Sequence, residues 1–117
     1  MKTIEELREF FEADRFAAEM GAVITECGEG GATVEMDAGP LFTLADFAFA
    51  VAANAGGVPT VSLQNSISFL HAVKPGRLTA RAERVSETRR TCCYDVSVTD
   101  EAGNLTARMS VTGYRRD

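Results

Sequence analysis

The sequence contains few of the residues from which metal sites are built. Among its 117 residues there are three cysteines and one histidine. The cysteines, Cys27, Cys92 and Cys93, are odd in number and lack the spacing of zinc ligands. His71 is the one imidazole that could join them. We therefore expect no metal site and no cofactor, and this cysteine content favours a reducing cytoplasm as the location.

Long apolar runs and targeting signals are also missing. The longest apolar stretch is interrupted by Asp46 and is shorter than the roughly 20 residues that a membrane-spanning helix needs. No charged-then-apolar leader precedes a small-residue cleavage site, so we expect neither secretion nor a membrane partner. The net charge of −5 and the lack of mixed aromatic and basic clusters argue against nucleic-acid binding. Basic side chains are concentrated in residues 59–117, where they form either ordinary solvated strand faces or a patch for an anionic ligand.

The residues that are present predict one domain spanning residues 1–117, with a modest hydrophobic core. Thr3 followed by Glu6 has the form of a helix capping box, and apolar residues follow at helical spacing. We therefore expect a first, amphipathic helix over about residues 3–18.

The stretch 41–57, LFTLADFAFAVAANAGG, is the element around which we expect the fold to be organised. It is apolar on nearly every side, and a helix without a polar face is buried along most of its length. Gly56 and Gly57 are typical of a helix stop. Its one charged residue is Asp46, and a buried carboxylate must be paired, placed at the helix start or used in chemistry.

The rest of the chain alternates between apolar and polar residues, as strands do. Segments 22–27 and 32–37 flank a glycine-rich turn and predict a hairpin. After the central helix, four runs predict four consecutive antiparallel strands, each with one apolar face. Their apolar rows are Val61, Leu63, Ile67 and Phe69; Leu78, Ala80 and Ala82; Tyr94, Val96 and Val98; and Leu105, Ala107, Met109 and Val111. A one-sided sheet and an apolar helix bury each other if the sheet curls around the helix, which predicts an α+β architecture with about six strands.

Four segments make the prediction more specific. They are FTLADFAFAVAANAGG at 42–57, SISFLHAVKPGRLTARAE at 66–83, YDVSVTDEAGNLTA at 94–107 and TGYRR at 112–116. These segments resemble the PaaI-type thioesterases of the hot-dog fold superfamily, in which a curved antiparallel sheet wraps around a buried central helix. The resemblance implies an acyl-CoA thioesterase that acts as a homodimer or homotetramer, with active sites at the subunit interface.

By this resemblance, Asp46 is the catalytic carboxylate, which either activates a water molecule or attacks the thioester carbonyl itself. From the residues alone, it equally fits a carboxylate that stabilises the helix start or pairs with an arginine across an interface. Further candidates for substrate contact are Leu41, Phe42, Asn54, Gln64, Asn65, Ser66, Arg89 and Arg90.

These further candidates have alternative roles. Asn54 could instead cap the helix. Asn65, which interrupts its apolar row, could mark a bulge or the interface. Arg89 and Arg90 could meet the phosphates of coenzyme A or serve solubility alone, as could the other basic residues of this half.

The chain departs from the family just before the central helix. The family carries a loop ending in His-Gly-Gly there, and a glycine N–H of this loop helps to form the oxyanion hole. In this sequence Pro40 is followed directly by Leu41. Either the protein lacks the loop, or a mobile loop is missing from the printed sequence. We favour the second alternative. A Cα separation of about 3.8 Å across Pro40–Leu41 would exclude a missing loop, because this is the distance across one peptide bond. True absence of the loop would remove one oxyanion donor and argue against thioesterase activity. The alternative function is a non-catalytic hot-dog module that binds acyl-CoA or serves in assembly, and a hot-dog hydratase or dehydratase is a third.

Overall fold

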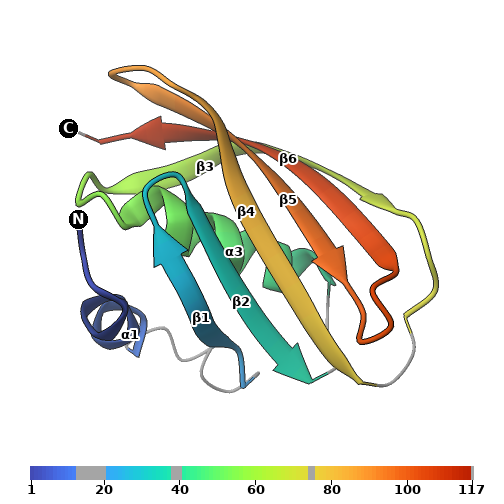
Figure 1. The fold of residues 1–117 in the computed structure, drawn as a ribbon. Coiled ribbons are helices and arrows are strands. Elements are labelled where there is room, and N and C mark those ends of the chain that lie inside the picture. Colours follow the sequence, from blue (N-terminus) through green and yellow to red (C-terminus); the bar gives the residue numbers. More distant parts are fainter. Residues whose placement is uncertain (13–20, 38–40, 74–75, 117) are drawn as a thin grey trace.

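The computed structural model describes residues 1–12, 21–37, 41–73 and 76–116, with the side chains of residues 11 and 12 left aside. Figure 1 shows two helices and six strands in this part of the chain. In chain order they are α1 (Ile4–Glu12), β1 (Val23–Gly28), β2 (Gly31–Asp37), α3 (Leu41–Asn54), β3 (Thr60–Phe69), β4 (Arg77–Glu87), β5 (Thr91–Thr99) and β6 (Leu105–Arg115).

The six strands form one antiparallel sheet in the order β1-β2-β4-β5-β6-β3. The hairpin of β1 and β2 is confirmed. The predicted run of four consecutive paired strands is wrong for β3, which pairs with β6 instead of β4. Alternation along a strand shows which side chains share a face, but it does not show which strand lies beside it, so the sequence pattern could not place β3 at the edge.

The sheet curves around α3, which lies against its concave face (Figure 1). The helix packs mainly against β2, β4 and β5. The apolar rows predicted for these strands face the helix and are almost fully buried; they are Ala32, Val34, Met36, Leu78, Ala80, Ala82, Tyr94, Val96 and Val98. The predicted α+β architecture, a curved sheet around a buried helix, is confirmed.

The predicted apolar row of β3 is wrong because the strand contains a β-bulge. The register with β6 shifts between Ser62 and Gln64. Val61 lies opposite Tyr114 and Ile67 opposite Met109, and these two partners point to opposite faces of β6. Val61 is therefore on the outer face of the sheet, the face turned away from α3.

A second bulge changes the start of β6. Thr99 pairs with Leu105, while the preceding Val98 pairs with Ala107, so Thr106 is the extra residue. Leu105 was predicted to face the core, but it is 38% exposed. Thr106 is buried in its place and donates a hydrogen bond from its hydroxyl to the carbonyl of Val98 at 2.9 Å.

Helix α1 begins with the predicted capping box. The backbone N–H of Glu6 donates to Thr3 Oγ1 at 3.2 Å, and the backbone N–H of Thr3 donates to Glu6 Oε1 at 3.3 Å. Leu7 is fully buried, and Arg8 donates to the carbonyl of Ile24 in β1. The predicted continuation of this helix to residue 18 lies outside the described residues.

Candidate active site

Helix α3 has one accessible face. Leu44, Ala45, Ala48 and Val51 are fully buried, as expected for the central helix. The residues that keep some exposure are Phe42, Thr43, Asp46, Ala50, Ala53 and Asn54. They recur every three or four positions, so they form a single stripe along the helix. The prediction that this helix is buried along most of its length is confirmed, and the stripe is the part of α3 that stays accessible in the single chain.

Asp46 lies on this stripe in the second turn of α3 and is half-buried. Side chains on a helix lean toward its N-terminus, so the carboxylate leans over the first turn. The first-turn N–H groups have no partner within the helix, and the helix dipole is positive there. This environment favours an ionised carboxylate beside hydrogen-bond donors that could stabilise a second negative charge.

The concave side of β3 is uncovered beside α3, because the helix is centred over β2, β4 and β5. Asn65, Ile67 and Phe69 point to this side, as their partners in β6 do, and Phe69 is 65% exposed. The side-chain nitrogen of Asn65 donates to Ser62 Oγ at 3.1 Å. Its Oδ1 is buried and accepts no hydrogen bond from any described residue. Asn65 therefore carries an acceptor that still needs a donor.

The other predicted contacts on α3 lie at its two ends. Leu41 is buried in the first turn, whereas Phe42 is 40% exposed. Asn54 closes the last turn: it donates to the carbonyl of Ala50 at 2.8 Å and accepts from the backbone N–H of Thr60 at 2.9 Å. Asn54 is about 12 Å along the helix axis from Asp46. The capping role accounts for Asn54, and its contact with substrate stays a prediction.

Gln64 and Ser66 lie on the outer face of β3, on the side of the sheet opposite α3. Both are exposed. Within one chain the structure therefore does not bring these two residues to Asp46, although it brings their neighbour Asn65 to the concave side.

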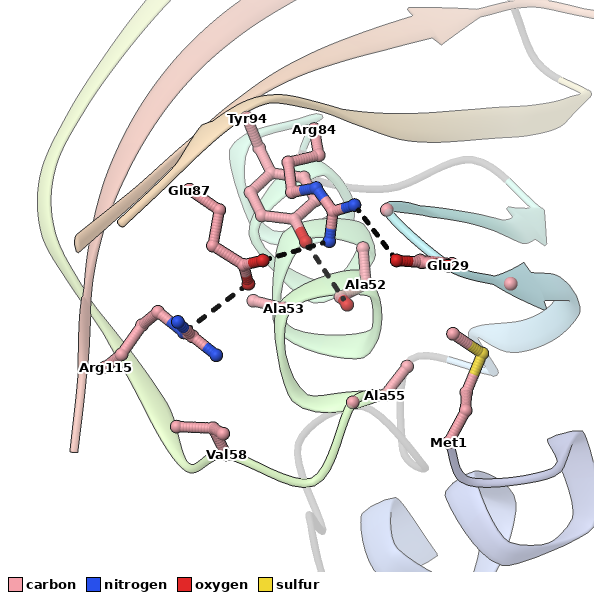
Figure 2. Close-up of a pocket in the computed structure, with 13 residues that line it drawn as sticks. Met1, Glu29, Ala52, Ala53, Ala55, Val58, Arg84, Glu87, Tyr94 and Arg115 are labelled. Atoms are coloured by element: carbon pink, nitrogen blue, oxygen red, sulfur yellow. Dashed lines mark hydrogen bonds and ion pairs between the residues drawn. The ribbon is translucent and has the colours of Figure 1, made fainter. Parts of the chain in front are cut away.

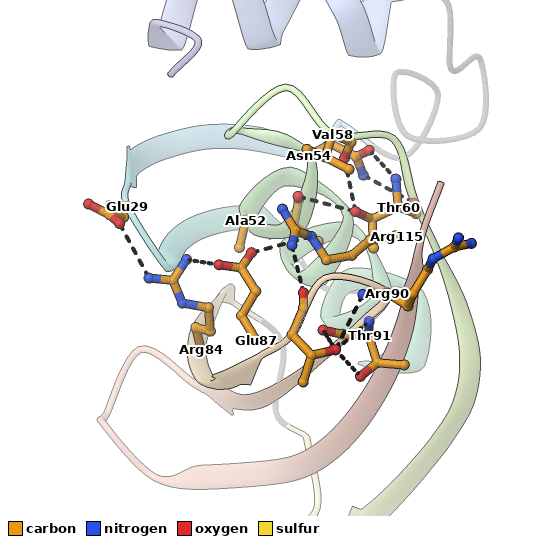
Figure 3. A network of polar contacts seen from close by, with 12 residues as sticks. Glu29, Ala52, Asn54, Val58, Thr60, Arg84, Glu87, Arg90, Thr91 and Arg115 are labelled. Atoms are coloured by element: carbon orange, nitrogen blue, oxygen red, sulfur yellow. Dashed lines mark hydrogen bonds and ion pairs between the residues drawn. The ribbon is translucent and has the colours of Figure 1, made fainter. Parts of the chain in front are cut away.

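Arg89 and Arg90 are exposed in the turn between β4 and β5. Arg90 donates from its guanidinium to the hydroxyl of Tyr114 at 3.2 Å, and its carbonyl accepts from the backbone N–H of Arg115 at 2.7 Å. These contacts place the turn near Asn54 (Figure 3), at the end of α3 opposite to Asp46. The structure does not bring Arg89 and Arg90 to Asp46 within one chain.

Other arginines of the basic half are neutralised on the outer face. Arg77 pairs with Glu35 at 3.3 Å and Asp37 at 3.2 Å, and the hydrogen bonds that its guanidinium donates to both carboxylates raise its pKa. Arg81 pairs with Glu83 at 3.1 Å. Lys74 lies outside the described residues. Carboxylates of neighbouring strands thus already engage Arg77 and Arg81.

Two classes of site were also considered. Among the described residues, no group of three or more His, Cys, Asp or Glu side chains could hold a metal ion. No helix in this part of the chain is long and apolar enough to cross a membrane.

The family model of the thioesterase superfamily matches residues 38–107, a span that contains α3 with Asp46. The chain belongs to the thioesterase superfamily. It is a thioester hydrolase, as the sequence predicts.

A curated relative from Archaeoglobus fulgidus, named "Putative esterase", is 31% identical over 127 residues, which covers 96% of this chain and 82% of the relative. This alignment is longer than the 117-residue chain, so it places residues of the relative where this chain has none.

Two solved structures share the fold. The E. coli PaaI protein from the phenylacetic acid degradation operon is 27% identical, with a TM-score of 0.88 over 94% of this chain and 90% of that chain. A hypothetical thioesterase from Streptococcus pneumoniae TIGR4, solved with coenzyme A, is 26% identical, with a TM-score of 0.84 over 93% and 96% of the two chains. The predicted PaaI-type hot-dog fold is confirmed.

Proposed function

We propose that this thioester hydrolase acts on acyl-CoA and that Asp46 is its catalytic carboxylate. The observation that carries the proposal is the position of Asp46: it is the one charged side chain on the accessible stripe of an otherwise apolar, buried helix. A carboxylate is costly to keep in such surroundings without a role. The stripe also lies within the span that the family model matches.

The chemistry follows from the position of the carboxylate. As a general base, Asp46 takes a proton from a water molecule while the water oxygen attacks the carbonyl carbon of the thioester. As a nucleophile, it attacks that carbon directly, and water then hydrolyses the resulting anhydride. Either route ends in a carboxylic acid and a free thiol. Both place negative charge on the carbonyl oxygen, and the free N–H groups in the first turn of α3 are suited to stabilise it.

The choice of acyl-CoA rests on similarity and on charge. The related protein from Streptococcus pneumoniae was solved with coenzyme A. In this chain, Arg89 and Arg90 are exposed in the β4–β5 turn, where guanidinium groups can bind phosphates.

A second copy of the chain would complete the site. The edge of β3 is open, and it exposes Leu63 by 62% and Phe69 by 65%. Antiparallel pairing of two β3 edges reverses one strand relative to the other. The β4–β5 turn of the second copy, with Arg89 and Arg90, would then lie near the Asp46 end of α3. The same pairing would offer donors to the unpaired Oδ1 of Asn65.

A non-catalytic acyl-CoA-binding module is the second candidate. It is favoured by the direct junction of Pro40 and Leu41, where the family carries its His-Gly-Gly loop. Residues 38–40 lie outside the described residues, so the Cα separation at this junction is not part of the structure described. The two candidates differ in turnover, which an assay measures directly.

The test is hydrolysis of a panel of acyl-CoAs by the wild-type protein, Asp46→Asn and Asp95→Asn. Asp95 is an exposed carboxylate on β5, so its substitution is the matched control. We expect Asp46→Asn to lower kcat by roughly 10²–10⁴-fold and Asp95→Asn to leave it unchanged. Equal activity in all three proteins would reject the role of Asp46. Binding of acyl-CoA without turnover by the wild type would favour the binding module.

Single-turnover hydrolysis in heavy-oxygen water separates the two routes. Heavy oxygen in the Asp46 carboxylate would show direct attack followed by hydrolysis at the Asp46 carbonyl of the anhydride, because water activation labels only the released acid.

A further inference from the structure

A pocket lies at the C-terminal end of α3, away from Asp46. It has a volume of about 320 Å³, at the small end of the range for small-molecule sites. Its floor consists of short apolar side chains at the end of the helix, and the ring of Tyr94 forms a wall (Figure 2). Met1 and Val58 lie at the rim. This floor suits a short apolar or aromatic group.

The polar wall of this pocket contains two arginines that share one carboxylate. Arg84 Nη1 lies 3.4 Å from Glu87 Oε2, and Arg115 Nε lies 3.4 Å from Glu87 Oε1. Figure 2 shows both guanidinium groups on the pocket side of Glu87. Strong charge-assisted hydrogen bonds are shorter, at about 2.7–2.9 Å. Glu87 therefore satisfies neither guanidinium fully.

Both arginines have a further contact besides Glu87: Arg115 with a backbone carbonyl, and Arg84 with Glu29, a second carboxylate that lines the pocket. Arg115 donates from Nη1 to the carbonyl of Thr88 at 2.6 Å. Arg84 contacts Glu29 at 3.5 Å, and Glu29 is largely exposed. The two arginine side chains themselves are only 28% and 21% exposed. Each guanidinium has five N–H donors, so both retain donors for a further acceptor.

The negative end of the helix is partly offset here, because its last carbonyls accept hydrogen bonds, two of them at 3.1 and 2.8 Å and two as weak contacts at 3.5 Å. The carbonyls of residues 52–55 accept, in order, from the Tyr94 hydroxyl at 3.5 Å, Thr60 Oγ1 at 3.5 Å, Gly57 N at 3.1 Å and Lys2 N at 2.8 Å. Burial raises the pKa of Tyr94, which keeps its hydroxyl a donor. Figure 3 shows the links between this helix end and the neighbouring strands.

We propose that this pocket binds a small monocarboxylic acid with a short apolar or aromatic body. The ligand carboxylate occupies donors of Arg84 and Arg115, competing with Glu87, while its body lies on the helix floor against Tyr94. The pocket is about 10 Å along α3 from Asp46, measured to Ala53, so it is separate from the hydrolytic site and does not depend on the proposed activity.

The binding test uses amide NMR of the wild-type protein with hexanoate as the probe. We expect concentration-dependent shifts at Gly30, Ala53 and Gly56, which line the pocket, and none at Phe42 and Asp46. Acetate lacks the apolar body, and hexan-1-ol lacks the charge, so each should bind more weakly than hexanoate. Inorganic phosphate distinguishes a general anion site: shifts as large as those with hexanoate would overturn the choice of an organic acid.

Two substitutions in opposite directions test the arginine pair. Arg115→Gln should weaken hexanoate binding by about tenfold or more, because it removes a charged donor. Glu87→Gln should strengthen binding, because it removes the competing carboxylate. The matched controls are Arg81→Gln and Glu83→Gln on the outer face, which should leave the affinity unchanged. Thermal melting shows that each variant is folded.

Three results would overturn the proposal. They are no shifts in the wild type at millimolar hexanoate, shifts confined to the Asp46 end of α3, and weaker binding in Glu87→Gln. The last result would make Glu87 part of the ligand site and not its competitor.

Discussion

The two ends of α3 differ in how their backbone groups and side chains are used. At the N-terminal end, Phe42 and Asp46 lie on an accessible stripe, and the strand that flanks it, β3, is uncovered on that side. At the C-terminal end, the last carbonyls accept hydrogen bonds from side chains and backbone of other segments. Asn54 joins this end to the start of β3.

This difference predicts that the two ends of α3 have different roles, one in the stability of the fold and the other in catalysis. The C-terminal end is fixed to the sheet and holds the helix in position, so substitutions there should change the free energy of unfolding. The N-terminal end has N–H groups without a partner inside the helix and a carboxylate on the accessible stripe, so changes there should alter catalysis with little loss of stability. Each prediction below tests this division.

The largest expected effect is a gain of hydrolytic activity from a change at the N-terminal end of α3. Insertion of a His-Gly-Gly loop between Pro40 and Leu41 should raise kcat by roughly 10²–10³-fold, the usual contribution of one oxyanion donor. The measurement is steady-state hydrolysis of an acyl-CoA that the wild type accepts. A Ser-Ser-Ser loop of equal length is the control. A similar gain in kcat with both loops would show that the length of the inserted loop raises the activity and that the oxyanion donor of His-Gly-Gly does not.

At the C-terminal end of α3, Gly113→Ala should destabilise the protein by about 1–3 kcal/mol through overpacking. A Cβ atom at this position would lie 2.9 Å from Cys92 Sγ and 2.9 Å from Phe49 Cζ, both in the core. Urea unfolding measures the change. Gly28→Ala is the control, because a Cβ there has no heavy atom within 4 Å. Equal stability of wild type and Gly113→Ala would mean that this end is more loosely packed than the structure shows.

Asn54→Ala should cost about 1–2 kcal/mol, because it leaves the N–H of Thr60 without its acceptor and the carbonyl of Ala50 without this donor. Hydrolysis per folded molecule should stay within about twofold of the wild type. Gln64→Ala, an exposed position, is the control and should change stability by less than about 0.5 kcal/mol. If kcat per folded molecule of Asn54→Ala fell by more than about twofold, the result would instead support the predicted substrate contact.

The smallest effect concerns Asp100, in the turn between β5 and β6. Hydrogen bonds from the backbone N–H of Asn104 at 2.9 Å and from its side chain at 3.1 Å lower the pKa of Asp100. The folded pKa is below the unfolded value, so the contribution to stability is present above about pH 4 and is lost as pH falls through the folded pKa.

Asp100→Asn should therefore lose slightly less thermal stability than the wild type between about pH 6 and pH 3. Melting temperatures across this range measure the difference. Parallel curves for the two proteins would show that the turn does not contribute to the acid response.

Local sequence signals predicted most of the elements. The capping box at Thr3 and Glu6, the hairpin of β1 and β2 and the central helix are all formed by residues close together in the chain. For these elements, propensity, turn residues and hydrophobic spacing agree, so short-range patterns are sufficient.

The errors came from the places where one extra residue changes the face of a strand. The bulges near Leu63 and at Thr106 reverse the alternation without leaving a clear sequence signal. The place of β3 beside β6 depends on pairing between distant segments, which alternation does not encode.

The candidate site was predictable only in part. Asp46 was identified by its isolation in an apolar helix and by the family resemblance, and its catalytic role is still a proposal. The substrate contacts proposed for Arg89 and Arg90, and a donor for Asn65 Oδ1, are placed by the proposed second copy, so neither the sequence nor one chain defines them. The cytoplasmic location and the assembly of two or four copies likewise stay predictions.

The bulge in β3 has a consequence for how copies of this chain meet. An uninterrupted, apolar edge strand is a template on which further strands can add and form fibres. The bulge at Leu63 breaks the ladder of the open edge, which leaves the segment from Gln64 to Phe69 as the longer regular stretch. A partner strand can match this stretch in fewer registers than it could a uniform edge. The bulge at Leu63, which reverses the alternation of β3, thus also hinders the addition of further strands to the exposed edge.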